Sequence, residues 1–212
     1  PTLRGSAAVP TTALLTAEAI ASHWDFPVIV KPRSGAGSRG VRLVEDRAAL
    51  EAIGPDESQI IQENLPGDEF SVDVLAGADG AVIAAVPRSR TKVDSGVSIA
   101  GYTLHSTELE QTAAAVAEAI GLVGVANVQL RYDSAGVAAL LEVNPRFPGA
   151  MPLTIAAGVD MPSLAVDLAL GRPLPVRLPF RELANVRFLE DIFLDPAQIV
   201  LAVDPQPGES RT

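Results

Sequence analysis

The chain has 212 residues, 48% of them hydrophobic but only 4% aromatic, and its formal net charge at pH 7 is -10. This length allows one domain with a real core or two lobes that share a cleft, and the negative charge argues against a nucleic-acid backbone as partner. The absence of cysteine excludes disulfides, thiolate zinc sites and cysteine nucleophiles, and two histidines argue against a histidine-rich metal site.

Targeting and membrane signals are not found in the sequence. No apolar run approaches membrane-spanning length, and no charged segment followed by an apolar one opens the chain. We therefore expect a cytoplasmic protein without a membrane partner. Because the first residue is Pro1 and not methionine, we expect a processed chain or a piece of a longer one.

The first predicted elements are a helix capped by Thr16, a strand at 26–32 rich in β-branched residues and a second strand at 41–44. Between the strands lies RSGAGSRG, whose glycines formally match the G-x-G-x-x-G pattern. A dinucleotide site needs a helix directly after these glycines, and a P-loop needs a Lys–Ser/Thr pair. Neither follows, so both readings are excluded.

What remains is a strand–loop–strand hairpin, an arrangement that protein kinases use to cover nucleotide phosphates. Glycines let backbone N–H groups approach phosphate oxygens, serine hydroxyls add donors, and Lys31 supplies a point charge. The alternative is a surface hairpin whose glycines only make a turn, but the number of glycines and serines exceeds what a turn needs. The candidate phosphate-binding residues are Lys31, Ser34, Gly35, Gly37, Ser38 and Gly40.

The middle of the chain predicts a helix at 46–53, a strand at 59–63 and a hairpin at 70–86. A basic run follows, formed by Arg88, Arg90 and Lys92. Such a run is either a solvated loop or a surface that faces anionic substrate groups, and the sequence leaves both open. Further on, a capping box from Thr107 to Glu110 predicts a helix that ends before Gly121.

A second hairpin is predicted from strands at 125–131 and 140–146. Alternation turns Leu141 and Val143 to one face and Glu142 and Asn144 to the other, with Gln129 on the latter face. Three oxygen-bearing side chains then converge, which suits a hard cation such as Mg²⁺ better than a merely solvated edge strand. Arg146 follows with a fork of donors for phosphate or carboxylate.

The last part predicts helices at about 151–157 and 161–170 and one strand within 185–193. Taken in their order along the chain, the predicted elements and motifs resemble those of the ATP-grasp superfamily. The likeness is greatest to the ATP-grasp domains of carbamoyl phosphate synthetase large chains and related carboxylate–amine ligases. The resemblance covers roughly residues 9–175 and rests on three blocks, which are PVIVKP with the glycine loop, IIQENLPGDEFSVDVL, and NVQL followed by LLEVNPRF.

This resemblance implies an α+β fold with a small lid subdomain, a larger antiparallel-sheet palm subdomain, and nucleotide between them. The expected boundaries are 1–62 for the N-terminal segment and lid, 63–203 for the palm and 204–212 for a disordered tail. The domain that precedes the lid in relatives is expected to be absent from this chain.

The resemblance also implies roles for single residues. Lys31 would contact the α and β phosphates, Glu63 to Leu65 would line the adenine pocket, and Glu69 would hold the ribose. The implied nucleotide-binding set is Lys31, Ser34, Gly35, Gly37, Ser38, Gly40, Gln62, Glu63, Asn64, Leu65, Glu69, Gln129 and Glu142. The implied metal ligands, for Mg²⁺ or alternatively Mn²⁺, are Gln129, Glu142 and Asn144.

Glu142, Asn144 and Arg146 form the implied catalytic set, and Arg90 and Lys92 are candidates for substrate contacts by position alone. The implied reaction has two steps. A carboxylate, or bicarbonate, attacks the γ-phosphate of ATP to give an acyl phosphate, and an amine or similar nucleophile then displaces phosphate. Such a reaction needs positioning and charge neutralisation and no covalent protein nucleophile, in agreement with the residues.

Two alternatives stay open. One is a nucleotide-binding or assembly module without turnover, because a basic residue that contacts nucleotide ahead of the lid in relatives is missing here. The other is a kinase-like phosphotransferase with a similar hairpin. The expected partners are ATP, a small carboxylate and an amine, and a homo-oligomer is compatible with the sequence.

Overall fold

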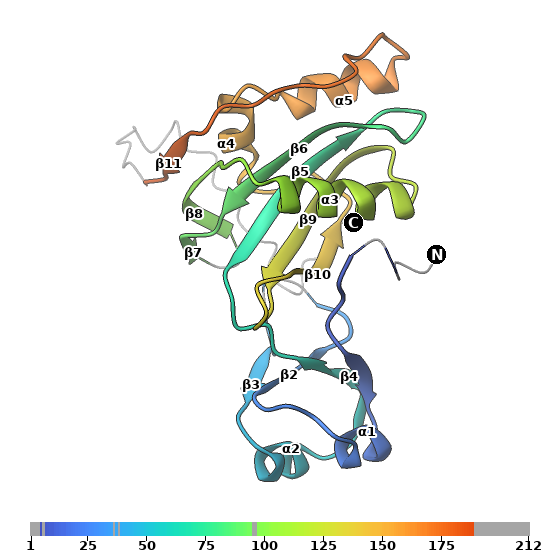
Figure 1. Cartoon of the computed structure of the whole chain (residues 1–212), viewed down its shortest axis with the longest axis vertical. Coiled ribbons are helices and arrows are strands. Elements are labelled where there is room, and N and C mark those ends of the chain that lie inside the picture. Colours follow the sequence, from blue (N-terminus) through green and yellow to red (C-terminus); the bar gives the residue numbers. More distant parts are fainter. Residues whose placement is uncertain (1–4, 6, 36, 38, 95–96, 189–212) are drawn as a thin grey trace, which may run out of the picture.

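The computed structural model describes residues 5, 7–35, 37, 39–94 and 97–188, with the backbone alone at 92–94 and 97–99. It has a smaller and a larger part that meet at a narrow waist (Figure 1). The smaller part contains β1 (Thr12–Leu15), α1 (Ala17–Ala21), β2 (Val28–Pro32), β3 (Arg42–Val44), α2 (Arg47–Ile53) and β4 (Asp56–Glu63). The larger part contains β5 (Glu69–Ala76), β6 (Val82–Ser89), β7 (Lys92–Asp94), β8 (Val97–Tyr102), α3 (Thr107–Ala119), β9 (Gly124–Tyr132), β10 (Ala138–Asn144), α4 (Met151–Ala156), α5 (Met161–Ala169) and β11 (Ala184–Val186).

The smaller part is an antiparallel sheet in the order β1-β4-β2-β3, with α1 and α2 packed against it. The hydroxyl of Thr16 and the carboxylate of Asp46 cap these helices at their N-termini, as the sequence predicts for Thr16. Leu15, Val30 and Leu50 are fully buried between sheet and helices. Strand β1 was not predicted, because four residues with a single β-branched member give too weak a signal.

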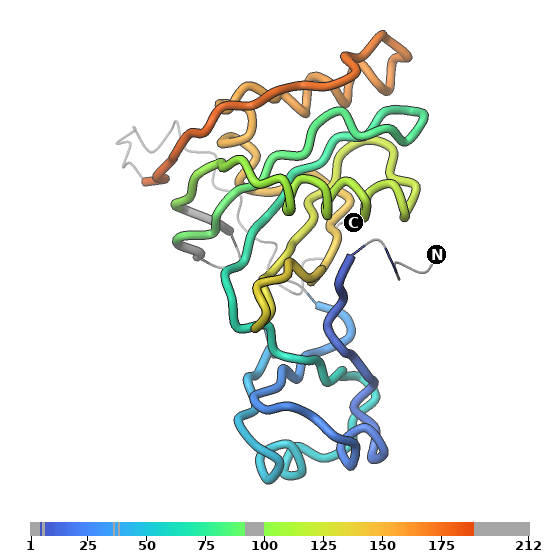
Figure 2. The backbone as a smooth tube through the Cα atoms, in the orientation of Figure 1, coloured from blue at the N-terminus to red at the C-terminus, as the bar shows by residue number. Residues whose placement is uncertain are grey.

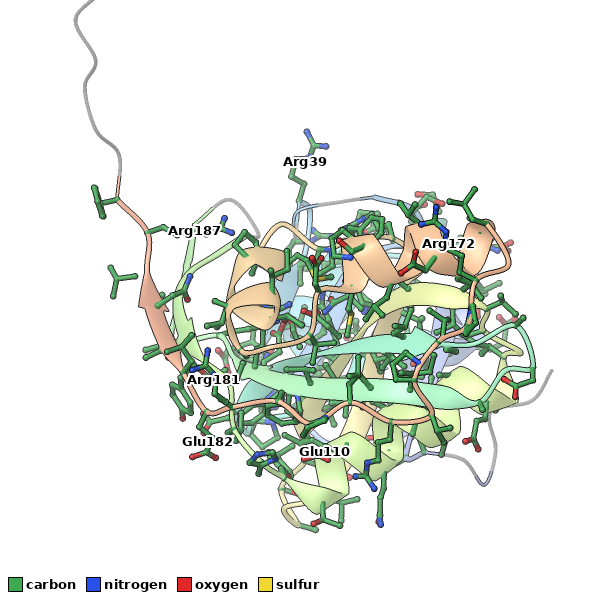
Figure 3. The ribbon with its side chains drawn as sticks, turned by 90° about the horizontal axis from the view of Figure 1, so that it is seen from above. Arg39, Glu110, Arg172, Arg181, Glu182 and Arg187 are labelled. Atoms are coloured by element: carbon green, nitrogen blue, oxygen red, sulfur yellow. The ribbon has the colours of Figure 1, made fainter. Side chains whose placement is uncertain are left out.

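The larger part is built on an antiparallel sheet in the order β10-β9-β5-β6. Helix α3 covers one face and α4 with α5 cover the other, as Figure 3 shows from above. Along β5 the side chains alternate between the two layers, so that Val72 and Val74 contact α3 whereas Leu75 packs with Met151 and Met161. None of the helices in the described ranges is long and apolar enough to span a membrane.

One predicted helix start is wrong, and one predicted strand is only partly within the described residues. The N-cap of α3 is Ser106 and not Thr107, because the Ser106 hydroxyl accepts the Leu109 amide at 3.4 Å while the Glu110 carboxylate accepts the Ser106 amide at 3.3 Å. The predicted strand at 185–193 is β11, but its residues beyond 188 and the predicted tail at 204–212 lie outside the described residues.

A buried ion pair crosses the face of the large sheet that α4 covers. Arg88 donates from Nε and Nη2 to the two carboxylate oxygens of Asp73 at 2.8 and 2.7 Å, and the two side chains are only 2% and 0% exposed. Asp73 also accepts the Asn127 amide at 2.8 Å and the Thr154 hydroxyl at 2.5 Å. Arg88 therefore belongs neither to a solvated loop nor to a surface that faces substrate, which were the two interpretations of the basic run. Alternation along β6 instead turns its side chain under α4.

Two chain segments connect the parts (Figure 2). The N-terminal segment bridges to β10 at Ala8 and then enters β1, while residues 64–68 connect β4 to β5. At the waist, the Thr11 amide donates to the Glu63 carboxylate at 3.0 Å and the Glu63 amide donates to the Thr11 carbonyl at 2.8 Å. The 64–68 connection is fixed to β9, because the Gly67 amide donates to the Tyr132 carbonyl at 2.9 Å.

We expect Arg88→Met to lower the free energy of unfolding by about 3–5 kcal/mol, since it leaves the Asp73 carboxylate buried without a countercharge. Urea denaturation measures this. The matched control is Arg172→Met, which breaks an ion pair whose members, Arg172 and Asp167, are 61% and 35% exposed and which should contribute at most about 1 kcal/mol. Similar losses in the two variants would show that burial does not make the Asp73 pair special.

Gly67→Ala is expected to destabilise the protein by about 1–3 kcal/mol. A Cβ at Gly67 would lie 2.6 Å from Tyr132 Cβ and 2.8 Å from the Tyr132 carbonyl oxygen, so the connection has to move. Gly35→Ala is the control, because a Cβ there meets nothing within 4 Å. Thermal unfolding of the two variants compares them, and an unshifted midpoint for Gly67→Ala would contradict the predicted clash.

Candidate functional site

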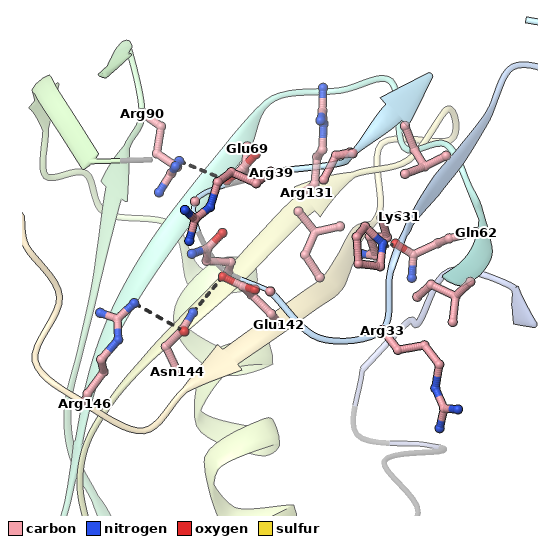
Figure 4. Close-up of a pocket in the computed structure, with 18 residues that line it drawn as sticks. Lys31, Arg33, Arg39, Gln62, Glu69, Arg90, Arg131, Glu142, Asn144 and Arg146 are labelled. Atoms are coloured by element: carbon pink, nitrogen blue, oxygen red, sulfur yellow. Dashed lines mark hydrogen bonds and ion pairs between the residues drawn. The ribbon is translucent and has the colours of Figure 1, made fainter. Parts of the chain in front are cut away.

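A cleft of about 560 Å³ lies between the two parts and is lined by side chains from both (Figure 4). Most of the predicted site residues line it: Lys31, Gly35, Gly37, Gln62, Glu69, Arg90, Gln129, Glu142, Asn144 and Arg146. Other predicted residues are not among those that line it: Ser34, Gly40, Glu63, Asn64 and Leu65. Ser38 and the side chain of Lys92 lie outside what the structure describes.

The β9–β10 hairpin supplies the polar floor of the cleft. Glu142 pairs in register with Gln129, and Asn144 donates from Nδ2 to Glu142 Oε1 at 2.7 Å. The predicted shared face of Gln129, Glu142 and Asn144 is therefore confirmed. Glu142 is exposed to solvent, whereas Gln129 and Asn144 are half-buried, so the floor opens toward the cleft.

The prediction that Leu141 and Val143 share one face, opposite Glu142 and Asn144, is wrong. Leu141 lines the cleft beside Glu142, and Leu140 occupies the core at 6% exposure. The pairing register of β10 shifts between Leu140 and Glu142, which adds one residue to the strand and moves Leu141 to the cleft side. Two adjacent leucines carry no signal in the sequence that would show which of them is buried.

Arg146 follows the β9–β10 hairpin, two residues after Asn144. Its Nη2 donates to Asn144 Oδ1 at 3.4 Å and its Nη1 to the Phe147 carbonyl at 3.3 Å, so its guanidinium lies next to the Glu142–Asn144 pair (Figure 4). The side chain is exposed. A planar donor fork in this position can bind a phosphate or carboxylate in two-point fashion.

The smaller part contributes an ammonium group from β2. Lys31 Nζ donates to Gln62 Oε1 at 2.8 Å, and Gln62 in turn donates to the Thr12 hydroxyl at 2.8 Å, which fixes the amide orientation. Burial lowers the pKa of Lys31, and the negative charge of Glu142 across the cleft opposes that shift. A half-buried cation is desolvated and can interact strongly with an anion that enters the cleft.

Basic side chains outnumber carboxylates among the residues that line the cleft. The basic set is Lys31, Arg33, Arg39, Arg90, Arg131 and Arg146, and the carboxylates are Glu69 and Glu142. Glu69 forms an ion pair with Arg90 at 2.9 Å, and both also border a second cavity of about 440 Å³. A chain of net charge -10 thus concentrates positive charge at one place, which favours a polyanionic ligand.

An apolar strip lies beside this charge. Ile29 and Ile60 are half-buried on the cleft side of β2 and β4, where a flat heterocyclic base could pack. They were not predicted, although each stands two residues before a predicted site residue, Lys31 or Gln62, and so shares its strand face. Arg131 was likewise missed as a site residue, although the same spacing places it on the face of Gln129.

The possible metal ligands are few. In the ranges that the structure describes, no group of three or more His, Cys, Asp or Glu side chains is suited to a metal. Gln129, Glu142 and Asn144 offer one carboxylate and two amide oxygens. Mg²⁺ retains several waters and usually binds through one or two carboxylates together with substrate phosphates, so this set fits Mg²⁺ held jointly with a phosphate ligand.

Comparison with known proteins agrees with the geometry. Residues 56–192 match the family described as "ATP-grasp in the biosynthetic pathway with Ter operon", and residues 1–62 match "Carbamoyl-phosphate synthase L chain, ATP binding domain". The chain is 30% identical over 211 residues to the carbamoyl phosphate synthase large chain of Gemmatimonas aurantiaca. That alignment covers 92% of this chain but only 18% of the relative's length.

Solved structures share the fold. The biotin carboxylase of Campylobacter jejuni, in a complex with β,γ-ATP, matches 81% of this chain and 44% of its own with a TM-score of 0.71 and 24% identity. The biotin carboxylase domain dimer of Hydrogenobacter thermophilus 2-oxoglutarate carboxylase, in complex with MgADP, ADP and bicarbonate, matches 84% of this chain and 44% of its own, with a TM-score of 0.67 and 19% identity. The expected α+β ATP-grasp fold is therefore confirmed, and the chain belongs to the ATP-grasp family.

Proposed function

We propose that this chain is the ATP-binding and phosphoryl-transfer part of an ATP-dependent ligase that joins a carboxylate to an amine or similar nucleophile through an acyl phosphate. The observation that carries the proposal is the convergence of Lys31 from one sheet and Glu142, Asn144 and Arg146 from another on a single cation-rich cleft. In this proposal residues 1–62 act as the lid and residues 63–203 as the palm.

The nucleotide is proposed to span both parts. Its adenine packs against Ile29 and Ile60 and contacts the backbone of 63–65, whose side chains do not line the cleft. Its ribose hydroxyls bind the Glu69 carboxylate. Its phosphates are proposed to lie between the glycine-rich loop and Lys31. The position of Lys31 supports this orientation, because Lys31 is the last residue but one of β2, directly before that loop.

Gln129, Glu142 and Asn144 would hold Mg²⁺, which supplies charge neutralisation at the phosphate oxygens when bound. Arg146 donates to the phosphoryl group in transfer, where a fork of charged donors stabilises the added negative charge. Arg90 and Lys92 are proposed substrate contacts, and the Arg90 guanidinium, which lines the cleft, is proposed to bind the carboxylate substrate.

The proposed reaction balances without a covalent protein intermediate. A carboxylate oxygen attacks the γ-phosphorus, the bond to the β,γ-bridging oxygen breaks, and ADP leaves. The nucleophile then attacks the acyl carbon, inorganic phosphate leaves, and an attacking amine loses one proton. Bicarbonate is one candidate for the carboxylate, since it is bound in the Hydrogenobacter complex.

A nucleotide-binding module without turnover is the second candidate. It is supported by the six basic side chains that line the cleft, which suit a nucleotide whether or not turnover follows. The two candidates differ in one measurable respect, because only the ligase releases ADP in response to a carboxylate.

An ADP-release screen of the full-length protein against bicarbonate, amino acids and small acids tests the proposal, and one carboxylate is expected to stimulate release. Glu142→Gln should lower that turnover at least about 100-fold without changing the melting temperature, since it removes the only carboxylate of the metal set. The matched control is Glu118→Gln on the exposed side of α3. ATP binding without stimulated release would favour the second candidate, whereas a phosphorylated product that is stable without any amine would indicate a kinase-like transferase.

The affinity for ATP should depend on pH through Lys31. Burial lowers the pKa of Lys31 in the free protein, and bound phosphates favour its charged form, so the pKa rises on binding. Affinity is then constant at pH values below the free-protein pKa and falls as the pH rises through the interval between the two pKa values. Calorimetry over a pH series that ends near the ordinary lysine pKa, about 10.4, measures this.

The Lys31 variants give the controls. Lys31→Ala should weaken ATP binding throughout this pH range, because the charge is gone. Lys31→Arg keeps a charge that does not titrate in it and should flatten the profile. If Lys31→Arg reproduced the wild-type pH dependence, another group would be responsible.

A further inference from the structure

We infer that the buried carboxylate of Asp73 is a positioning group for Arg146, because it binds Asn127 and Thr154, which lie next to the two ends of the segment that carries Arg146. Asp73 lies on β5, is fully buried and is not part of the cleft. The inference rests on the proposed function for the role of Arg146, but the structural part of it does not.

The first end of the segment is Asn144, the last residue of β10. Asn144 pairs in register with Asn127 of β9, and Asn127 pairs in register with Asp73 of β5. The Asn127 amide donates to Asp73 Oδ1 at 2.8 Å, and Asn127 is 3% exposed. A row of three polar side chains thus runs from the buried carboxylate to the floor of the cleft.

The second end of the segment is α4, which begins at Met151, five positions after Arg146. Thr154 on this helix is fully buried, and its hydroxyl donates to Asp73 Oδ2 at 2.5 Å, a distance typical of a hydrogen bond to a charged oxygen. The connecting residues 145–150 therefore lie between a strand residue paired with Asn127 and a helix that carries Thr154, and Asn127 and Thr154 both donate to the same carboxylate. Figure 3 shows α4 lying directly over this face of the sheet.

Asp73 can act in this way because its own position is fixed. Each carboxylate oxygen accepts two hydrogen bonds, Oδ1 from Arg88 and Asn127 and Oδ2 from Arg88 and Thr154. No buried side-chain nitrogen or oxygen in the described part of the chain is without a partner. The bidentate Arg88 contact keeps the carboxylate from rotating, so a shift of β9 or α4 would break a buried hydrogen bond.

Arg146 itself depends on its segment. Its guanidinium donates to Asn144 Oδ1 and to the Phe147 carbonyl, and its own amide donates to the Asn144 carbonyl at 2.8 Å. These partners belong to the same stretch of chain, and Phe147 is 48% exposed. The direction in which Arg146 points is therefore set by where the two ends of the segment are held. A displacement of about 1 Å at such a group can reduce turnover by up to about 100-fold.

The test is Thr154→Val, a nearly isosteric change that removes only the hydroxyl donor to Asp73. Hydrogen exchange over residues 145–153 should accelerate at least about 5-fold. With the carboxylate that stimulates ADP release in the full-length protein, kcat should fall about 10-fold or more while KM for ATP stays within about 2-fold. Thr154→Ser restores the donor and should restore both readouts.

Thr103→Val is the matched control. Thr103 is 1% exposed, and its hydroxyl donates to the Arg181 carbonyl at 2.8 Å. Arg181 in turn donates to the Ala156 carbonyl at the C-terminal end of α4, so this variant perturbs the helix through a residue other than Asp73. It should change stability without changing kcat or the exchange of 145–153. If Thr154→Val does not fold, the second variant is Asn127→Ala, which removes the amide donor on β9 and should give the same split between kcat and KM.

Each outcome decides the inference. Unchanged exchange over 145–153 in Thr154→Val, or an equal loss of kcat in Thr103→Val, would overturn it and leave Asp73 with a role in stability alone. If the wild-type protein binds ATP but no carboxylate stimulates ADP release, the proposed function fails, and hydrogen exchange alone then decides whether Asp73 fixes the segment.

Discussion

The buried Asp73–Arg88 pair is the constraint around which the larger part is arranged. Removing two charges from water costs several kcal/mol per ion, and their attraction offsets that cost only when the remaining hydrogen-bonding capacity is also satisfied. Here Asn127 and Thr154 satisfy it, so β5, β6, β9 and α4 are joined in one arrangement. Because replacing a whole buried ion pair by well-packed apolar residues is often neutral or stabilising, the four-group arrangement is not explained by stability alone.

Polarity changes in steps along this face of the sheet. Under α4 and α5 the face is apolar, with Leu75 and Val86 fully buried. The Asp73 row comes next, buried but charged, and beyond it the sheet faces the cleft with Glu69 and Arg131. Where the helices cover the sheet, charged side chains are thus paired with each other inside the protein. Where the helices do not cover it, charged side chains face the cleft and can bind a ligand. This explains how an acidic chain can present a basic cleft.

Sequence reasoning succeeded where alternation was uninterrupted and failed where packing decided. The shared face of Gln129, Glu142 and Asn144 follows from period two and a clear turn, so it could be predicted. Leu141 could not, because a bulge is a packing solution that two equivalent leucines do not encode. Arg88 was misjudged for a related reason, since only the placement of α4 shows that this end of β6 is covered.

The division of the site between two sheets has a consequence for how it works. Lys31 and Gln62 come from the smaller part, and the predicted metal ligands come from the larger part, so neither part alone holds the complete set. Two chain segments connect the parts and are paired to each other at Thr11 and Glu63. A nucleotide that contacts both parts binds the closed arrangement better than an open one, and this difference in affinity is what favours closure. In the proposed reaction, such closure also excludes water from the phosphoryl group, which would otherwise be hydrolysed.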